Sequence, residues 1–494
     1  MNEEGEMSEA AVSEDGLRQG GARDRPLWLV SLPIVGLLLM ITGGLVFPPL
    51  VLGRPQLALE LVFIAAAVLA IVILRAGGVS WDEMQRAVMS RMDAAMPAFF
   101  ILLFIGVLIG TWMLSGTIPM LVYYGLTLVN PETFYLIAFI IPVVFSTLTG
   151  TSYGSAGTIG VVLISIGGAM NADLGITAGA VIGGAYFGDK LSPLSDTTNL
   201  AAIACNVDLY GHIQSMLYTT LPSAVIAASV FTYLGFATEL TAAPEQAQID
   251  GLMAGIASLF EFSWLLLLPP IIVLVGCILR QPALPTLLLS ILSAAILAVS
   301  LQPYSVAELG AAMRSGFDLD VMAPRVQASE GLTSLMNRGG VYSMAEPIFI
   351  AFFVFFFVGV VDSVSAIPRV IRRLLGWSRS AKSTALTALF ATGAVNALTS
   401  NQYATSFIVG DAFRRQFDER EIDRRVLSRS LEDYGTMLES LVPWTTTTLF
   451  MVATLGVPWT DYVGWQLLSI TNLILDRKST RLNSSHQIIS YAVF

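Results

Sequence analysis

The first residues in this chain that could do chemistry lie in LTGTSYGSAGTIG, Leu148 to Gly160. Gly150 to Gly154 matches G-x-S-x-G, the pattern that places a serine nucleophile on the strand-to-helix turn of many hydrolases. Such a serine needs a base beside it, and outside residues 476–494 the one histidine is His212. No strand pattern precedes Ser152. We therefore disfavour a serine hydrolase, including an intramembrane one, and expect no enzymatic activity.

The same hydroxyl groups suit a small hard cation such as Na⁺, which binds several oxygen ligands. A second polar stretch, FGDKLSPLSDTTNLA from Phe187, interrupts an apolar run. Two carboxylates there are costly unless they face a cavity or bind something. The alternative is that Ser195, Asp196 and Asn199 only cap the following half-helix. The cation-site candidates of the first half are Thr151, Ser152, Ser155, Asp189, Ser195, Asp196, Thr197, Thr198 and Asn199.

A weaker set of candidates follows about 250 residues later. It consists of Asn401, Gln402, Glu439 and Thr446. Matching the two stretches by eye places Glu439 opposite Ser192 and leaves no carboxylate opposite Asp189 or Asp196. We therefore expect an asymmetric site that is richer in charge in the first half. A carboxylate that holds either Na⁺ or H⁺, never both, is sufficient for exchange, and spacing alone does not say which carboxylate does so.

Composition indicates the kind of element that positions these residues. Of 494 residues, 55% are hydrophobic and 13% are charged, against about 25% charged in soluble domains. Apolar runs of about 20 residues, the length that spans a bilayer as a helix, recur along the chain. The net charge of −10 gives no indication of nucleic-acid binding, and two cysteines in apolar surroundings predict neither a disulfide nor a metal framework. The sequence predicts an all-α polytopic membrane protein without a cofactor.

Both ends of the chain are expected to lie outside the fold. Residues 1–25 are rich in Glu, Gly, Ser and Ala and predict a disordered tail. Residues 476–494, DRKSTRLNSSHQIISYAVF, resemble the in-frame translation of a sequencing-library adapter, so we expect a non-native tail and a truncated native C-terminus.

Three pairs of segments repeat at an offset of about 250 residues and predict two homologous halves, 26–240 and 262–475, joined by an external linker at 241–261. After Pro119 the chain has no basic residue, whereas the segment after Pro368 has several. The positive-inside rule therefore predicts halves of opposite orientation, as in many secondary transporters. We expect about ten transmembrane helices, two re-entrant hairpins with tips at 151–155 and 399–403, broken helices at the midplane, and both termini in the cytoplasm. The expected spans are 27–47, 57–76, 97–116, 174–206, 213–236, 262–279, 283–302, 345–363, 425–456 and 463 onward.

GTSYGSAGTIG, followed by GAVIGGAYFGDKLSPLSDTTNLAAIA, closely resembles the NhaC-type Na⁺/H⁺ antiporter family. The resemblance extends over residues 25–475, with Tyr153 and Ser155 where the family usually has Trp and Thr. It implies a bacterial inner-membrane protein with hairpins and broken helices around a cation site, often in homodimers whose transport domains move like elevators. Thr151, Ser152, Asp189, Asp196, Thr197 and Asn199 become the carried-over cation-site residues.

The resulting hypothesis is an antiporter that exchanges Na⁺ for H⁺. Because the family also contains exchangers of malate with protons for lactate with sodium, a Na⁺-coupled organic-acid exchanger that binds a small carboxylate is the alternative. An ion channel would conduct without counter-transport. A proton flux that requires Na⁺ and saturates would exclude the channel.

Overall fold

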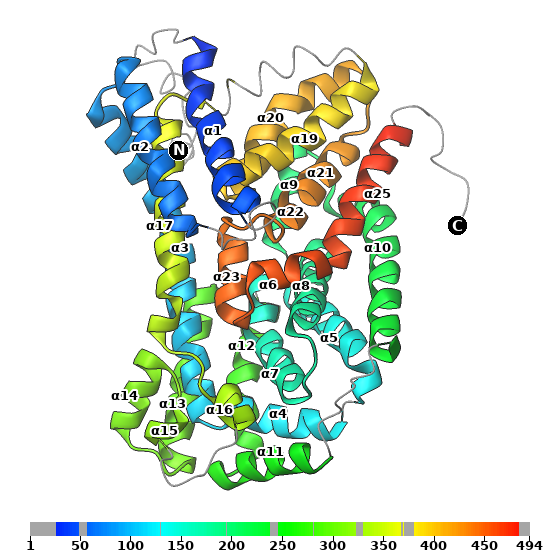
Figure 1. The fold of residues 1–494 in the computed structure, drawn as a ribbon. Helices are drawn as coiled ribbons and strands as arrows, with labels where there is room; N and C mark the ends of the chain where they lie inside the picture. The colour runs from blue at the N-terminus through cyan, green and yellow to red at the C-terminus, as the bar shows by residue number, and fades with distance from the viewer. Residues whose placement is uncertain are drawn as a thin grey trace, which may run out of the picture.

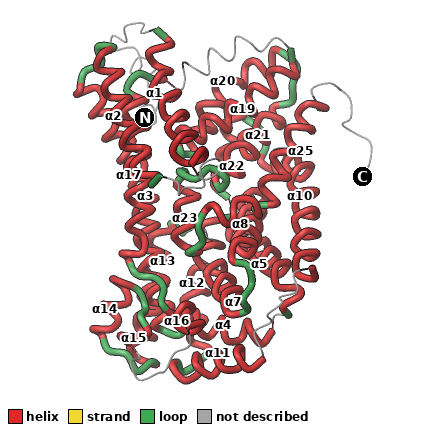
Figure 2. Tube along the Cα trace, in the orientation of Figure 1, coloured by secondary structure: helices red, strands yellow, loops and turns green. Residues whose placement is uncertain are grey.

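The computed structural model describes residues 26–48, 57–128, 130–193, 195–237, 246–279, 281–322, 330–366, 369 and 380–483. Within these ranges every regular element is a helix, as Figures 1 and 2 show. Residues 1–25 and 484–494, both expected to be tails, lie outside the described part, as does most of the basic segment after Pro368.

One side of the molecule is a group of long apolar helices. α2 (Leu59–Ala76) packs on α1 (Leu27–Ile41) and on α17 (Ala345–Asp362), and α17 in turn packs on the 34-residue α3 (Trp81–Leu114). An ion pair between Arg91 and Asp362 joins α3 to α17. Further along α3, α13 (Ala283–Leu301) packs between it and α12 (Leu268–Ile278). In Figure 1 these helices lie on the left, except α12, which lies near the middle.

The other side contains two series of helices, most of whose ends match at a constant offset. The first series is α5 (Phe134–Thr149), α6 (Ser152–Ser155), η5 (Ala156–Gly160), α7 (Val161–Ala169), α8 (Leu174–Leu191) and α9 (Asp196–Cys205). The second is α19 (Ala381–Thr399), α20 (Gln402–Glu419), α21 (Arg424–Leu431), η8 (Glu432–Thr436), α22 (Met437–Glu439) and α23 (Thr446–Leu455). In both series a hairpin of helices is followed by a helix that breaks and restarts.

Local conformation fixes the offset between the two series at 250 residues. Gly150 and Ser400, at the two hairpin tips, both adopt a left-handed backbone, and so do Asn206 and Gly456 at the far ends. The caps agree, because Thr151 and Asn401 cap the second helix of each hairpin and Ser195 and Thr445 cap the helix after each break. Glu439 is therefore the counterpart of Asp189. The alignment by eye that placed Glu439 opposite Ser192 was wrong, because it followed the identical Gly188 and Gly435 instead of the helix ends.

The remaining elements cover the periphery. They are η2 (Thr42–Val46), α4 (Thr117–Leu128), η4 (Pro131–Thr133), α10 (Leu209–Ala237), α11 (Gln246–Leu259), η6 (Trp264–Leu267), α14 (Val306–Ser315), α15 (Leu319–Met322), α16 (Glu330–Met336), η7 (Val341–Met344), α24 (Trp459–Tyr462), η9 (Val463–Trp465) and α25 (Leu467–Asn483). Most of the region expected to be a linker is helix α11, which packs on α4. α25 continues past residue 475 into the expected adapter-like stretch.

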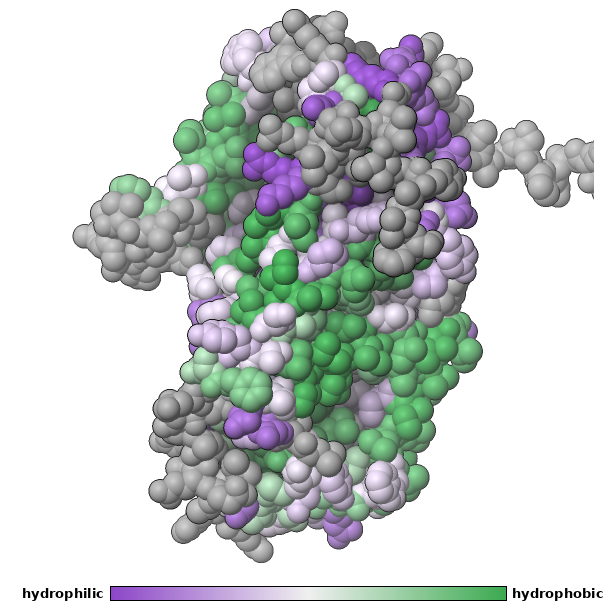
Figure 3. Space-filling view, turned by 90° about the vertical axis from the view of Figure 1, so that its right-hand side faces the viewer, coloured by the Kyte–Doolittle hydropathy of each residue, from purple (hydrophilic) through white to green (hydrophobic). Residues whose placement is uncertain are grey.

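The chain is a multi-pass membrane protein. Seven of its described helices are long and apolar enough to cross a bilayer, or eight spans if the pair Asp250–Leu259 and Trp264–Gly276, bent by 97°, counts as one. The sequence predicted about ten spans, and five of the seven helices overlap them. The other two, Pro131–Thr149 and Ser152–Ala169, are the arms of the first expected re-entrant hairpin. The expected spans 27–47, 174–206, 425–456 and 463 onward are not among the seven, because the helices there are short, are broken or carry charges. Figure 3 shows a broad hydrophobic band across the middle of the molecule with hydrophilic residues above and below it, as expected of a surface that faces lipid.

Candidate functional site

Asp189 lies at the break between α8 and α9 and is 5% exposed. Two hydroxyl groups hold its carboxylate. Ser152 Oγ, from the tip of the first hairpin, donates to Asp189 Oδ2 at 2.7 Å, and Ser195 Oγ, the N-cap of α9, donates to Asp189 Oδ1 at 2.7 Å. The sequence predicted these three residues as candidates, and the structure brings them together. A buried acid surrounded by hydroxyl oxygens is an arrangement that can hold either a proton or a small hard cation.

Small and hydroxyl-bearing residues bring the end of α8 close to α5. A Cβ on Gly188 would lie 2.0 Å from Ser146 Oγ and 2.1 Å from Thr147 N, so only glycine fits this close approach. Ser192 Oγ donates to Thr147 O at 2.9 Å. The break leaves carbonyl groups without helical partners, and Thr198 Oγ1 donates to the carbonyls of Asp189 and Lys190 at 3.2 and 3.0 Å.

Several other predicted residues have local roles. Thr151 Oγ1 accepts from Gly154 N at 3.3 Å, and Ser155 Oγ donates to Thr151 O at 2.8 Å. Asn199 Nδ2 donates to Pro193 O and Ser195 O at 2.9 and 2.6 Å. Of the three residues in the capping alternative, Ser195 is the N-cap of α9 and Asn199 donates to backbone carbonyls. Asp196 is exposed, and its carboxylate accepts a hydrogen bond from Tyr403 OH.

The second series builds a parallel arrangement around Glu439, which is 9% exposed. Thr447 Oγ1 donates to Glu439 Oε2 at 2.6 Å. Thr448 Oγ1 donates to the Glu439 carbonyl at 2.8 Å, as its counterpart Thr198 does to that of Asp189. Tyr153 OH, from the first hairpin, lies 2.9 Å from Thr447 Oγ1. One hydroxyl pair therefore connects the first hairpin to the acid of the second half.

The other second-half candidates are bound to the backbone. Asn401 Oδ1 accepts from Ala404 N at 2.9 Å, and Thr446 Oγ1 donates to Ser400 O at 3.3 Å. Gln402 Nε2 donates to Leu431 O at 2.7 Å, whereas its buried Oε1 has no hydrogen-bond partner among the described residues.

Glu432, in η8, is a buried acid that the sequence analysis missed. Its side chain is 0% exposed, and Thr197 Oγ1 and Thr436 Oγ1 each donate to Glu432 Oε1 at 2.9 Å. Thr197 Oγ1 also lies 3.1 Å from Ser195 Oγ. A continuous line of hydroxyl contacts thus joins Asp189 to Glu432. The adjacent acids in LEDYGT, inside a predicted span, were a signal that could have revealed them.

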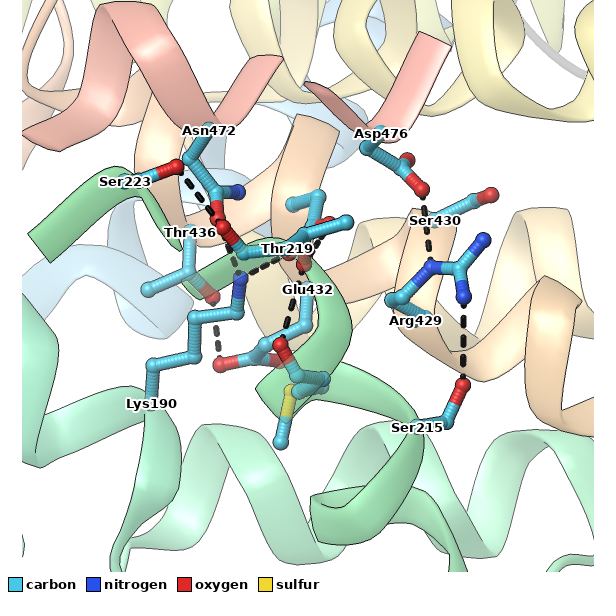
Figure 4. Close-up of polar contacts among 12 residues, drawn as sticks. Lys190, Ser215, Thr219, Ser223, Arg429, Ser430, Glu432, Thr436, Asn472 and Asp476 are labelled. Carbon is cyan, nitrogen blue, oxygen red and sulfur yellow. Dashed lines mark hydrogen bonds and ion pairs between the residues drawn. The ribbon is translucent and has the colours of Figure 1, made fainter. Parts of the chain in front are cut away.

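Asp433 was missed as well, and it pairs with Lys190. Both side chains are 0% exposed. Thr219 Oγ1 donates to Asp433 Oδ2 at 3.0 Å, and Lys190 Nζ donates to Asn472 Oδ1 at 3.2 Å. Figure 4 shows Lys190 with polar side chains of α10, η8 and α25, beside a second buried pair. In that pair Arg429 Nε donates to Asp476 Oδ1 at 2.8 Å.

The arrangement around Ser152 is not that of a hydrolase. His212, the histidine considered as a base, lies on α10, and its Nδ1 is 2.8 Å from Ser428 Oγ. The Ser152 hydroxyl donates to a carboxylate instead.

Comparison with known proteins agrees with transport. The family model described as "Na+/H+ antiporter family" matches residues 184–475, more than half of the chain. The Na⁺/H⁺ antiporter NhaC of Alkalihalophilus pseudofirmus is 35% identical over 78% of this chain and 82% of its own length. The malate-2H⁺/Na⁺-lactate antiporter of Bacillus subtilis is 32% identical over 84% of this chain and 86% of that protein.

A third relative, the arginine/ornithine antiporter ArcD of Halobacterium salinarum, is 32% identical over 90% of this chain and 89% of its own length. The names of these relatives cover a metal cation, organic acids and basic amino acids, so they agree on counter-transport and differ in substrate. They describe transporters and not enzymes. The chain belongs to the Na⁺/H⁺ antiporter family and is a secondary antiporter of the NhaC type.

Proposed function

We propose that the chain exchanges Na⁺ for H⁺ across the bacterial inner membrane, and that Asp189 is the carboxylate that carries either ion. The observation that supports this most directly is the burial of Asp189 at a helix break with hydroxyl groups from two elements on its carboxylate oxygens. A buried anion is costly unless a positive charge compensates it. Either a proton or a Na⁺ ion meets this requirement, and the two exclude each other.

The two matched series support a transport cycle with alternating access. No lysine or arginine lies between Arg91 and Lys190, whereas Lys382 and Arg414 flank the second hairpin. By the positive-inside rule the first hairpin enters from outside and the second from the cytoplasm. The halves are then inverted repeats with broken helices at the midplane, and both termini are cytoplasmic. We expect Asp189 to reach water on each side in turn.

Transport of an organic acid is the second candidate because two relatives named above carry organic substrates. A carboxylate substrate would be expected to bind a buried basic group or a half-helix N-terminus. Lys190, a buried basic side chain beside the first break, is already paired with Asp433. We therefore favour the metal cation as the substrate.

The test uses inverted vesicles from a host without antiporters, energised so that a fluorescent amine reports the pH gradient. We expect NaCl alone to collapse the pH gradient. We expect neither KCl nor malate to change the gradient further. Asp189→Asn should abolish the response. Asp208→Asn, a change of the same type at an exposed cap of α10, should preserve it.

Two outcomes would contradict the proposal. A response to Na⁺ that appears only with malate or with arginine would establish exchange of an organic substrate. A full response in Asp189→Asn, with loss in Glu439→Gln, would assign the exchange to the second half.

A further inference from the structure

The hydroxyl contacts between Asp189 and Glu432 contain too few hydrogens for the number of short contacts. Three contacts form the line, from Asp189 Oδ1 to Ser195 Oγ at 2.7 Å, from Ser195 Oγ to Thr197 Oγ1 at 3.1 Å, and from Thr197 Oγ1 to Glu432 Oε1 at 2.9 Å. Each contact is a hydrogen bond only if one hydrogen lies in it. The two hydroxyl groups supply two hydrogens, so all three contacts are hydrogen bonds at the same time only when a third hydrogen sits on a carboxyl group.

One added proton satisfies the whole line in either of two ways. With the proton on Glu432, Glu432 donates to Thr197, Thr197 to Ser195, and Ser195 to Asp189. With the proton on Asp189, the direction of every hydrogen bond reverses. Asp189 then donates to Ser195, Ser195 to Thr197, and Thr197 to Glu432. From these two equivalent arrangements we infer that Ser195 and Thr197 form a proton relay that transfers a single proton between Asp189 and Glu432. This inference rests on the proposed exchange at Asp189.

The surroundings of Glu432 favour a proton on its carboxyl group, at the end of the line away from Asp189. Glu432 Oε2 is buried and has no hydrogen-bond partner in the described part of the chain. A carboxylate oxygen buried without a donor is costly, and a proton on Glu432 removes the buried charge. The nearest buried ammonium group in this network, that of Lys190, is already bound to Asp433 and Asn472.

The transfer step balances. The hydrogen on Asp189 passes to Ser195 Oγ as Ser195 gives its own hydrogen to Thr197 Oγ1 and Thr197 gives its hydrogen to Glu432 Oε1. Asp189 ends ionised, Glu432 ends neutral, both hydroxyl groups are restored, and no electrons are transferred. The relay thereby gives the proton a route that leaves Asp189 from Oδ1. The other carboxylate oxygen, Oδ2, faces the hairpin tip, where it contacts Ser152. A cation that binds Asp189 displaces the proton to Glu432. The cation and the proton therefore do not use the same path.

The test separates proton movement from cation movement in proteoliposomes that contain the whole chain. Exchange of ²²Na⁺ for Na⁺ needs no proton, whereas Na⁺/H⁺ exchange does. For Thr197→Val we expect the Na⁺/H⁺ rate to fall by about 100-fold relative to the Na⁺/Na⁺ rate of the same variant, the usual cost of losing a positioned proton-transfer group. Thr197→Ser, which keeps the hydroxyl, should restore the rate. The matched control Thr436→Val removes a hydroxyl from the same Glu432 oxygen but leaves the line intact, so it should retain coupling.

The relay is overturned if Thr197→Val keeps a wild-type Na⁺/H⁺ rate. It is also overturned if folded Thr197→Val loses both exchanges and Thr197→Ser regains both, because Thr197 would then belong to the cation path. Wild-type protein that exchanges no ²²Na⁺ would refute the proposed function and the relay with it.

A second measurement does not depend on how Thr197→Val folds. In infrared difference spectra of the wild type, added Na⁺ should produce a protonated-carboxyl signal that is absent in Glu432→Gln. Identical spectra from the two proteins would refute a proton on Glu432.

Discussion

Replacing Asp433 by Asn should destabilise the protein strongly, because it breaks a fully buried ion pair from one side. Lys190 and Asp433 are both 0% exposed and join α8 of the first series to η8 of the second. In the variant the Lys190 ammonium keeps only neutral acceptors among the described residues, namely Asn472 Oδ1 at 3.2 Å and the amide oxygen of the replaced side chain. Its positive charge would then be buried with no carboxylate bound to it.

The size of the effect follows from the burial of both partners. Removing one member of a buried pair costs about 3–5 kcal/mol, most of it the penalty of the unpaired charge that remains. Lys190→Met should cost a similar amount, since among the described residues it leaves the Asp433 carboxylate with the Thr219 hydroxyl alone. The double variant buries no unpaired charge in this pair. We therefore expect it to be more stable than the sum of the single effects by about 2–3 kcal/mol.

A double-mutant cycle measures this coupling. The free energy of unfolding of each variant would be obtained from SDS titration in mixed micelles, followed by loss of helical circular dichroism. The exposed pair Arg415–Glu419, with side chains 88% and 53% exposed, provides the control cycle and should show no measurable coupling. A coupling near zero for Lys190 and Asp433 would refute the inference that they stabilise each other as a buried pair.

Two further predictions concern close packing and a surface turn. Gly188→Ala should destabilise the protein by about 1–3 kcal/mol in the same titration, because its Cβ would meet backbone atoms of α5 near 2 Å, whereas Gly168→Ala, with its nearest neighbour 4.0 Å away, should have a small effect. Arg424 donates to Asp418 at 2.7 and 2.5 Å and lowers the pKa of that carboxyl. A lowered folded-state pKa stabilises above the unfolded value of about 3.9 and the stabilisation is lost as pH falls through the folded value. The rate of amide hydrogen exchange in this turn, corrected for intrinsic rates, should therefore rise in acid. Arg424→Gln should abolish this rise.

The sequence was sufficient to predict the elements that carry the site. Both hairpin tips and both helix breaks lie where polar stretches interrupt apolar runs, because unpaired backbone at membrane depth needs hydroxyl and amide partners. Asp189, Ser152 and Ser195 could be predicted together for the same reason. Thr151 and Asn401 could be recognised as polar, but not as caps, since a hydroxyl or amide suits either role.

The partners across the two series could not be predicted from the sequence. Glu432 and Asp433 lie more than 230 residues from Thr197 and Lys190, and no local pattern specifies such a contact. The alignment of Glu439 failed for a different reason. Identical glycines suggested one register, whereas the left-handed residues and helix caps, which depend on backbone conformation, establish another.

The corrected register shows where the two halves differ chemically. At an offset of 250 residues, Asp189 and Glu439 are counterparts, but Lys190 corresponds to Ser440, Glu432 to Ile182 and Asp433 to Gly183. The helices after the two breaks begin and end at matching positions and have matching caps, and each break has one buried carboxylate. The lysine, however, is supplied by the first half and the two additional buried acids by the second. Ion binding at the two breaks cannot then be equivalent, because the buried charge around each carboxylate differs. The first break, with a relay partner in Glu432 and a paired lysine beside it, is the one equipped to exchange a proton for a cation.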